Sequence, residues 1–447
     1  MDQRSTYWIS ESAWRIIILL LVVMNAWLFW PGNLYFLNDD FIHIPLTDQN
    51  TFLQRNSVRP VHELLVKFDL LIWGKSSVGF HITAMLLHLM ICYQLFRLLF
   101  IIQTKWLNIN RSAARQTAFL SVALFLIYPQ HAEGYAWILG RTPVLSSVFF
   151  MGVLIIFFSK KLTTSRISAA FILFLLTLFT YEQSVLLPLM LLLVTFFEKK
   201  PVLKRKERSL VSLLFVVAII YIICRRLITK EIVGSYEGGN FISFQLSTIA
   251  ENFARVIGRL WLNPTLNPKY FLVGMAISLP LVIFIFYRSM KHRSASLWLL
   301  LGCIFLMIVP IVSLGVTIRS YESGRYLYIP SIFFVMMLSL VLSNNYWSKR
   351  ICFSFITLLC AYWMAGKFAA SSDYRRASVY AKQANQNVIQ HFQKSGKAIT
   401  IDTLHVTIRR LPVFRLGFNT GIKWLDPTID TTKIKVNYYY DEFIEEP

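Results

Sequence analysis

The chain alternates long apolar stretches with short polar connections from one end to the other. A helix needs roughly 20 apolar residues to cross a bilayer, and most of these stretches approach that length. Because a spanning segment must satisfy its own backbone hydrogen bonds, such runs predict helices rather than the strands of a barrel. We therefore predict an all-α polytopic membrane protein of the following eleven spans: residues 14–31, 79–101, 116–130, 143–158, 167–181, 184–197, 209–225, 270–287, 296–315, 326–343 and 351–366.

Composition and charge support this interpretation and add an orientation. The chain is 56% hydrophobic with a net charge of +22, more apolar than soluble proteins are. Lys and Arg collect in alternate connections, as cytoplasmic loops do, when the N-terminus is placed inside. They are spread over separate short loops, which excludes a nucleic-acid-binding patch. The first span ends "AWLFWP" without a small-residue cleavage site and predicts an uncleaved signal anchor.

The remaining connections form the predicted outer face. They include the loops 32–78 and 226–269 and the tail after the last span. The pattern of the tail predicts a helix followed by two strand-like pieces, "KAITIDTLHVTIRRL" and "KIKVNYYYDEF". We predict a transmembrane domain over 1–366, with an outer loop that carries acids, and a small extracytoplasmic α/β segment over 367–447. The five cysteines fall inside predicted spans and show neither a disulfide framework nor zinc-ligand spacing.

Ionisable residues gather at the outer ends of the spans and not at their centres. The pair Asp39 and Asp40 follows the first span directly, in "NDDF". An ion-coupled carrier would be expected to hold charge near the middle of the membrane, on interrupted helices of two related halves. The distribution therefore favours a site built at one membrane surface.

Six motifs in order then resemble a known family. They are "NDDF", "RPVHELLVKFDLLIWG", "GFHITAMLLHLM", "LFLIYPQHAEGYAWILGRTPVLSSVFF", "LFTYEQSVLLPLMLLL" and "ESGRYLYIPS". Together they resemble the membrane part of the transmembrane-and-TPR O-mannosyltransferases and their bacterial relatives, which are polytopic glycosyltransferases of the GT-C class. Two features depart from that family: Tyr181 precedes Glu182 where relatives have lysine, and the tail shows no 34-residue TPR period.

The resemblance implies sugar transfer from a polyprenyl phosphate, which needs a base for the acceptor hydroxyl and cations for the leaving phosphate. By resemblance we assign Asp39 as the base and Asp40 as a supporting acceptor, since neighbours in sequence cannot both face one point. Arg325 and Arg141 are the candidate phosphate-binding residues. The alternatives are that the acids are solvated residues at a helix exit, and that the arginines snorkel or pair with Glu322 or Glu133.

Four further residues are candidates for substrate binding or support. His131 and Glu133 lie where the third span breaks, and either bind the sugar or satisfy the backbone that the break frees. Glu182 either binds the acceptor or pairs with Arg141. Arg59 begins a helix whose pattern fits the outer interface, and it could reach the site. We also considered metal ligation by His81 and His88 with the acids, but no tight ligand spacing supports a metal, and none is predicted.

The predicted function is thus a membrane glycosyltransferase that moves a single sugar, with inversion, from a polyprenyl-phosphate donor to a glycan or protein acceptor at the extracytoplasmic face. No cofactor is predicted. The expected location is a bacterial inner membrane, with the N-terminus cytoplasmic and the C-terminus outside. Two alternatives remain at this point: an O-antigen ligase or polymerase, and a non-catalytic flippase or transporter of lipid-linked sugars.

Overall fold

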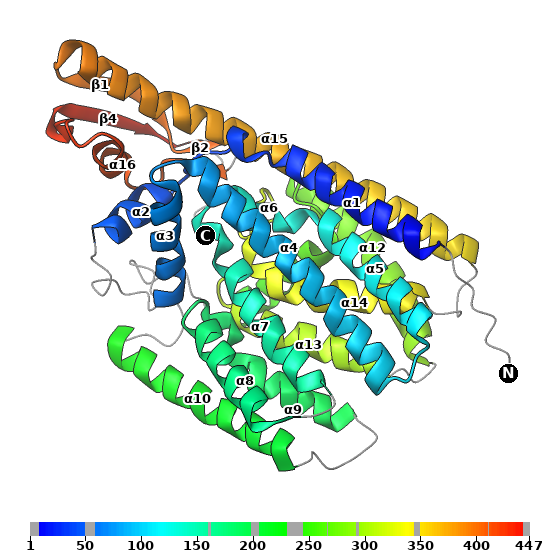
Figure 1. Ribbon diagram of the computed structural model, residues 1–447. Coiled ribbons are helices and arrows are strands. Elements are labelled where there is room, and N and C mark those ends of the chain that lie inside the picture. The colour runs from blue at the N-terminus through cyan, green and yellow to red at the C-terminus, as the bar shows by residue number, and fades with distance from the viewer. Residues whose placement is uncertain are drawn as a thin grey trace.

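The computed structural model describes residues 9–49, 59–159, 162–197, 205–229, 245–265, 267–291, 295–343, 349–409 and 411–440. A helix occupies each position where a span was predicted (Figure 1). These helices are α1 (Glu11–Leu28), α4 (Ser77–Ile101), α5 (Arg111–Ile127), α7 (Thr142–Phe158), α8 (Thr164–Leu178), α9 (Leu187–Phe197), α10 (Arg205–Thr229), α12 (Pro268–Lys291), α13 (Ala295–Val312), α14 (Tyr328–Ser343) and α15 (Lys349–Ser395).

Within the described ranges, six helical segments are long and apolar enough to cross a membrane, and three shorter apolar helices accompany them. The chain is a multi-pass membrane protein. The count of eleven spans and the predicted orientation of the termini stay predictions. Parts of the basic connections and of the predicted outer loops lie outside the described residues, among them 50–58, 160–161, 198–204, 230–244, 292–294 and 344–348.

Burial separates the central helices from those that face lipid. The apolar window that contains α14 is 89% buried, and that of α1 is 22% buried. α14 packs against α5, α7 and α13. α1 instead exposes Leu19, Leu20 and Val23, as expected of a helix whose outer face meets lipid chains.

Short elements at one end of the bundle interrupt the spans. α5 ends at Ile127 because Pro129 follows it, and the chain then forms a 3₁₀ turn η3 (Pro129–His131), a short helix α6 (Ala132–Ala136) and a second 3₁₀ turn η4 (Leu139–Arg141) before α7 begins. Another 3₁₀ turn, η6 (Gly324–Leu327), leads into α14 and packs against η3 and α6. These breaks place polar residues of the predicted site, among them Glu133 and Arg325, at one end of the bundle.

Helix α15 is longer than predicted. It runs without a break from Lys349 to Ser395, so the boundary predicted at 366 falls inside one continuous helix. Figure 1 shows it beside α1 and extending past the bundle to the C-terminal strands. It ends where Gly396 adopts φ 61°, a left-handed residue of the kind that commonly ends helices. The division into two domains at 366 stays a prediction.

The residues after α15 form a small α/β segment. β1 (Ile399–His405) pairs in parallel with β4 (Ile434–Tyr439), and β2 (Thr407–Ile408) pairs antiparallel with β3 (Leu411–Pro412). Helix α16 (Phe418–Leu425) packs against α2 (Asp40–Asp48), the short helix that begins at the acidic pair. A second apolar core joins this segment to the loop before α2 and to α6. We name residues 399–440 the C-terminal segment.

Helix α3 (Pro60–Trp73) turns its polar side inward. It buries Glu63 and Asp69 and exposes Leu64, Phe68 and Leu71. An exposed apolar face on a helix of a membrane protein fits the predicted place in the bilayer interface.

Candidate active site at one end of the helix bundle

The loop before α2 sets the directions of Asp39 and Asp40. Asn38 has φ 51°, a left-handed conformation that asparagine tolerates better than most residues. Its backbone N–H donates to the carbonyl of Val413 at 2.7 Å, so the C-terminal segment holds this turn. The two carboxylates have different surroundings after this turn: Asp40 is buried, whereas Asp39 is partly exposed.

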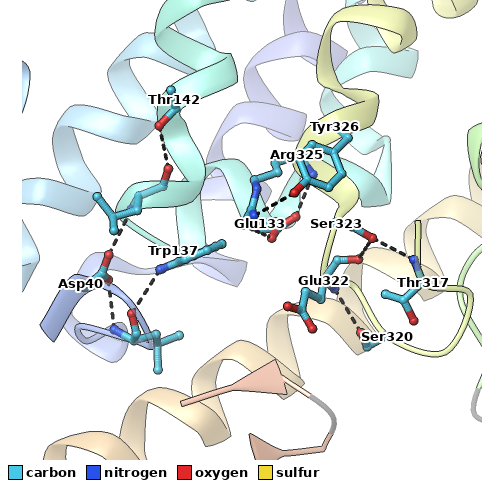
Figure 2. A network of polar contacts seen from close by, with 12 residues as sticks. Asp40, Glu133, Trp137, Thr142, Thr317, Ser320, Glu322, Ser323, Arg325 and Tyr326 are labelled. Atoms are coloured by element: carbon cyan, nitrogen blue, oxygen red, sulfur yellow. Dashed lines mark hydrogen bonds and ion pairs between the residues drawn. The ribbon is translucent and has the colours of Figure 1, made fainter. Parts of the chain in front are cut away.

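Asp40 fastens the loop to the rest of the bundle. Its Oδ2 accepts the backbone N–H of Leu37 at 3.0 Å and its Oδ1 accepts that of Leu139 at 3.1 Å. Trp137 adds a third link, since its indole Nε1 donates to the carbonyl of Leu37 at 3.1 Å (Figure 2). Burial raises the pKa of Asp40 to about 7, against the opposing effect of the two N–H groups. With 1% of its surface exposed, Asp40 is placed to position its neighbour.

Asp39 is the partly exposed carboxylate of the pair. Within the described part of the chain no hydrogen bond reaches its side chain. Burial raises its pKa, while the charges of Arg325 and Arg415 lower it and that of Glu322 raises it further. A carboxylate that is partly desolvated, and whose lone pairs are unused, is a stronger base than a solvated one.

Arg325, whose charge lowers the pKa of Asp39, is held in a fixed orientation. Its Nη1 contacts Oε1 of Glu133 at 2.9 Å, and its backbone N–H donates to Oε2 of the same carboxylate at 2.7 Å (Figure 2). The guanidinium also lies over the ring of Trp137, 4.4 Å from its centroid, and over that of Tyr326 at 4.9 Å. About a fifth of the Arg325 side chain is exposed, so the fixed cation stays accessible at the surface of the protein.

Glu133 is the buried partner in this arrangement. It is 1% exposed, and burial raises its pKa while Arg325 opposes that effect. Arg325 therefore pairs with Glu133, as one of the alternatives from the sequence proposed. Pairing does not remove Arg325 from the site, because the pair fixes its guanidinium.

The turn that carries Arg325 depends on two unusual backbone positions. Ser323 has φ 64°, and its Oγ accepts the N–H of Thr317 at 2.9 Å. Gly324 touches the carbonyl of Gln130 so closely that a Cβ would lie 2.6 Å from that oxygen. Glycine is therefore required where η6 crosses η3.

A buried arginine supports the same turn from behind. Arg259, on helix α11 (Leu246–Trp261), donates to the carbonyls of Thr317 and Ser320 at 2.9 and 2.6 Å and to Oε1 of Gln130 at 2.5 Å. These bonds join the loop 313–323 to η3. Arg325 follows this loop in η6, which packs against η3, so both the loop and η3 help to position it.

His131 has a structural place. It is fully buried, and its Nε2 lies 2.8 Å from the hydroxyl of Ser331. Its Nδ1 lies 3.1 Å from the carbonyl oxygen of Phe125. In a continuous helix the backbone N–H of residue 129 would donate to this carbonyl, but Pro129 has no N–H. The geometry favours backbone satisfaction over sugar binding.

Arg59 and Glu182 belong to a separate cluster. Arg59 donates to Glu182 through Nε at 3.1 Å and Nη2 at 2.8 Å, and Arg225 contacts the same carboxylate at 3.4 Å. The ring of the neighbouring Tyr181 lies 5.4 Å from the Arg59 guanidinium, measured to the ring centroid. Glu182 thus pairs with Arg59 and Arg225, and not with Arg141 as one alternative had it.

Arg141 does not fit the predicted phosphate-binding role. Its side chain and that of Asp69 are both 0% exposed and form an ion pair at 2.5 Å. Arg141 also donates to the carbonyl of Phe80 at 3.2 Å, and Thr83 donates to Asp69 at 2.6 Å. A guanidinium with no exposed surface cannot meet a lipid phosphate, and Arg141 instead joins α3 to η4, the turn that leads into α7.

We expect Arg141→Met to destabilise the fold. The change leaves Asp69 buried without its cation, and breaking such a pair typically costs about 3–5 kcal/mol. Thermal unfolding of the purified protein in detergent should show a large drop, and Arg141→Met combined with Asp69→Leu should recover much of it. A normally stable Arg141→Met protein that fails to transfer sugar would return Arg141 to the substrate site.

Two charged residues carried no sequence signal for the places they take. Arg415, whose charge lowers the pKa of Asp39, stands in an unremarkable stretch, "VFRLGF", and Asp69, the buried partner of Arg141, is one acid on a helix with several charges. Among the described residues, no group of three or more His, Cys, Asp and Glu side chains is arranged to hold a metal ion.

Comparison with known proteins adds three findings. No family model matches the chain. It is 29% identical over 127 residues to the protein O-mannosyl-transferase Tmtc3 of Drosophila melanogaster, and this alignment covers 26% of the chain and 13% of the fly protein. The similarity confirms the resemblance that the motifs indicated. The solved structure of ArnT from Cupriavidus metallidurans, bound to undecaprenyl phosphate, aligns with a TM-score of 0.47 and 11% identity, covering 96% of this chain and 90% of that one.

Proposed function

We propose that this protein is a membrane glycosyltransferase of the GT-C type that transfers one sugar from a polyprenyl phosphate to an acceptor hydroxyl at the extracytoplasmic face. The observation that carries the proposal is the placement of Asp39. It is a partly exposed carboxylate with no hydrogen-bond partner among the described residues, and it feels the charge of Arg325, whose orientation Glu133 and Trp137 fix. The local similarity to an O-mannosyl-transferase supports the reaction class.

The reaction follows from these two groups. Asp39 accepts the proton of the acceptor hydroxyl as its oxygen attacks the anomeric carbon from the side opposite the phosphate. The bond from that carbon to the phosphate oxygen breaks, so the configuration inverts. The phosphate leaves with an additional negative charge, which Arg325 stabilises more strongly than the charge of the intact donor. Asp40 holds the loop and does not contact substrate.

The test of this proposal is a comparison of cells with and without the gene. We expect cells that lack it to accumulate one polyprenyl-phosphate sugar and to lose a single sugar from one envelope glycan or glycoprotein. Mass analysis of the lipid and glycan fractions measures both. Unchanged donor lipids together with unchanged glycans would contradict the proposal.

The proposed orientation places the N-terminus in the cytoplasm and the C-terminal segment outside, as in a bacterial inner membrane. Lys206 and Lys423 are both exposed, at the start of α10 and on α16. With the exposed Cys224 replaced by serine, Lys423→Cys should react with an impermeant maleimide on intact spheroplasts, and Lys206→Cys only after permeabilisation. The reverse pattern would place the proposed site on the cytoplasmic side.

A further inference from the structure

The C-terminal segment is built onto the loop that carries Asp39. The Asn38 N–H bond to Val413 is one link, and Phe414 lies 5.2 Å from Phe41, centroid to centroid. Gly417 has φ 81°, and a Cβ there would lie 2.2 Å from Ile42. The backbone therefore approaches α2 at a distance that only glycine allows.

A second set of contacts fixes the other end of this junction. Trp424 donates through its indole to Oδ2 of Asp48 at 2.9 Å, and its ring lies 5.4 Å from that of Phe36. The backbone carbonyl of Trp424 also accepts a hydrogen bond from the ammonium group of Lys75. The segment is thus positioned by buried aromatic packing and backbone bonds on both sides of residue 415.

Arg415 projects from this junction toward the charges of the site. Its Nη2 contacts both oxygens of Glu322, at 3.1 and 3.4 Å, and 44% of its side chain is exposed. Within the described residues, its Nη1 and Nε have no hydrogen-bond partner. The charged groups near Asp39 are Arg325 and Glu322 on the loop into α14, Arg415 on the C-terminal segment, and the neighbouring Asp40.

The leaving phosphate gains negative charge as its bond to the sugar breaks, and arginine recognises phosphate oxygens through paired N–H groups. Arg325 uses its backbone N–H and Nη1 on Glu133 and its Nη2 on Tyr326. Arg141, the second cation expected from the sequence, is buried on Asp69. A second accessible guanidinium at this place is Arg415.

We propose that Arg415 of the C-terminal segment binds the donor phosphate, with Nε and Nη1 on phosphate oxygens while Nη2 stays on Glu322. This inference rests on the proposed function. It makes the C-terminal segment part of the catalytic site rather than a separate outer module. Glu322 then acts as a positioning residue, because it orients the guanidinium.

The test compares Arg415→Gln with Arg409→Gln. Arg409 is a matched control on the same segment, since it is 52% exposed and pairs with Asp373 of α15 at 3.4 Å, as Arg415 pairs with Glu322. We expect Arg415→Gln to lower sugar transfer by about 100-fold, the effect of removing one donor that stabilises developing negative charge. Arg415→Lys should recover part of the loss, and Arg409→Gln should transfer as the wild type does. Thermal unfolding of both glutamine variants verifies that each is folded.

Binding of polyprenyl phosphate without sugar separates this inference from the proposed function. We expect Arg415→Gln to bind this lipid at least tenfold more weakly than the wild type and Arg409→Gln. Equal transfer and equal lipid binding by Arg415→Gln and the wild type would overturn the inference, and so would equal losses in the two glutamine variants. A wild-type protein that binds the lipid with Arg415-dependent affinity but transfers no sugar would contradict the proposed function and leave the inference standing. A wild-type protein that neither binds nor transfers would overturn both.

Discussion

Asp39→Asn should abolish most sugar transfer while leaving the protein folded and able to bind its donor. Asparagine keeps the shape of the side chain but cannot accept the acceptor proton, and loss of a general base typically costs about 100- to 10,000-fold in rate. No described hydrogen bond depends on the Asp39 carboxylate, so the substitution leaves the loop intact. Transfer and donor binding are measured separately on protein reconstituted in liposomes.

Two controls sharpen this prediction. Asp402→Asn changes an exposed carboxylate on β1 and should leave transfer unchanged. Asp40→Asn can satisfy only one of the two backbone N–H groups that Asp40 now binds, so it should lower transfer less than Asp39→Asn does. The double variant should be little worse than Asp39→Asn, because residues that act as one unit are not additive. Near-normal transfer by a properly inserted Asp39→Asn protein would show that Asp39 is a solvated residue at a helix exit.

The pH dependence should report the same group. A base must be ionised, and burial raises the pKa of Asp39. Wild-type transfer should therefore decline as pH falls through that raised pKa, and this acidic limb should disappear from the residual activity of Asp39→Asn. An identical acidic limb in both proteins would assign it to another group.

Arg325→Lys should produce the second large effect. Lysine keeps the charge but loses the planar group that reaches Glu133 and stacks on Trp137. Loss of one preorganised donor to developing charge costs about 100- to 1,000-fold in kcat, and we expect a loss toward the lower end because a cation remains. Steady-state transfer kinetics give kcat and KM separately, and the charge-stabilising role predicts that kcat falls more than KM rises.

Arg409→Lys is the matched control for Arg325→Lys, because it makes the same change at an exposed ion pair outside the site. It should leave kcat and KM unchanged. Wild-type kinetics in Arg325→Lys would remove Arg325 from the site.

The helices could be predicted because apolar runs of spanning length have few other solutions in a membrane. A helix is found at each predicted position, and the charge of Arg325 acts on Asp39 of the acidic pair, while the roles of these residues stay predictions. The continuity of α15 was less visible, because the fall in hydropathy after residue 366 resembles the end of a span. No proline interrupts "KFAASSDYRRAS", however, and the helix continues into its polar part.

The partners of the charged residues could not be read from the sequence. Arg141 and Asp69 meet because α3 turns its polar side inward, whereas an interfacial helix with its acids in water would have left Arg141 free. Arg415 reaches the site only because Phe414, Gly417 and Trp424 dock the C-terminal segment on α2. Such tertiary packing over more than 370 residues of chain leaves no local pattern.

The central claim is that this protein breaks the bond between a sugar and a polyprenyl phosphate. The most direct measurement is the release of free polyprenyl phosphate from a panel of polyprenyl-phosphate sugars, by wild-type protein and Asp39→Asn in liposomes, with and without an acceptor fraction. We expect the wild type to release the lipid from one donor only when acceptor is present, with the sugar recovered on the acceptor, and Asp39→Asn to release about 100-fold less or lower. Movement of intact donor lipid across the bilayer without any release would instead show a flippase and contradict the account.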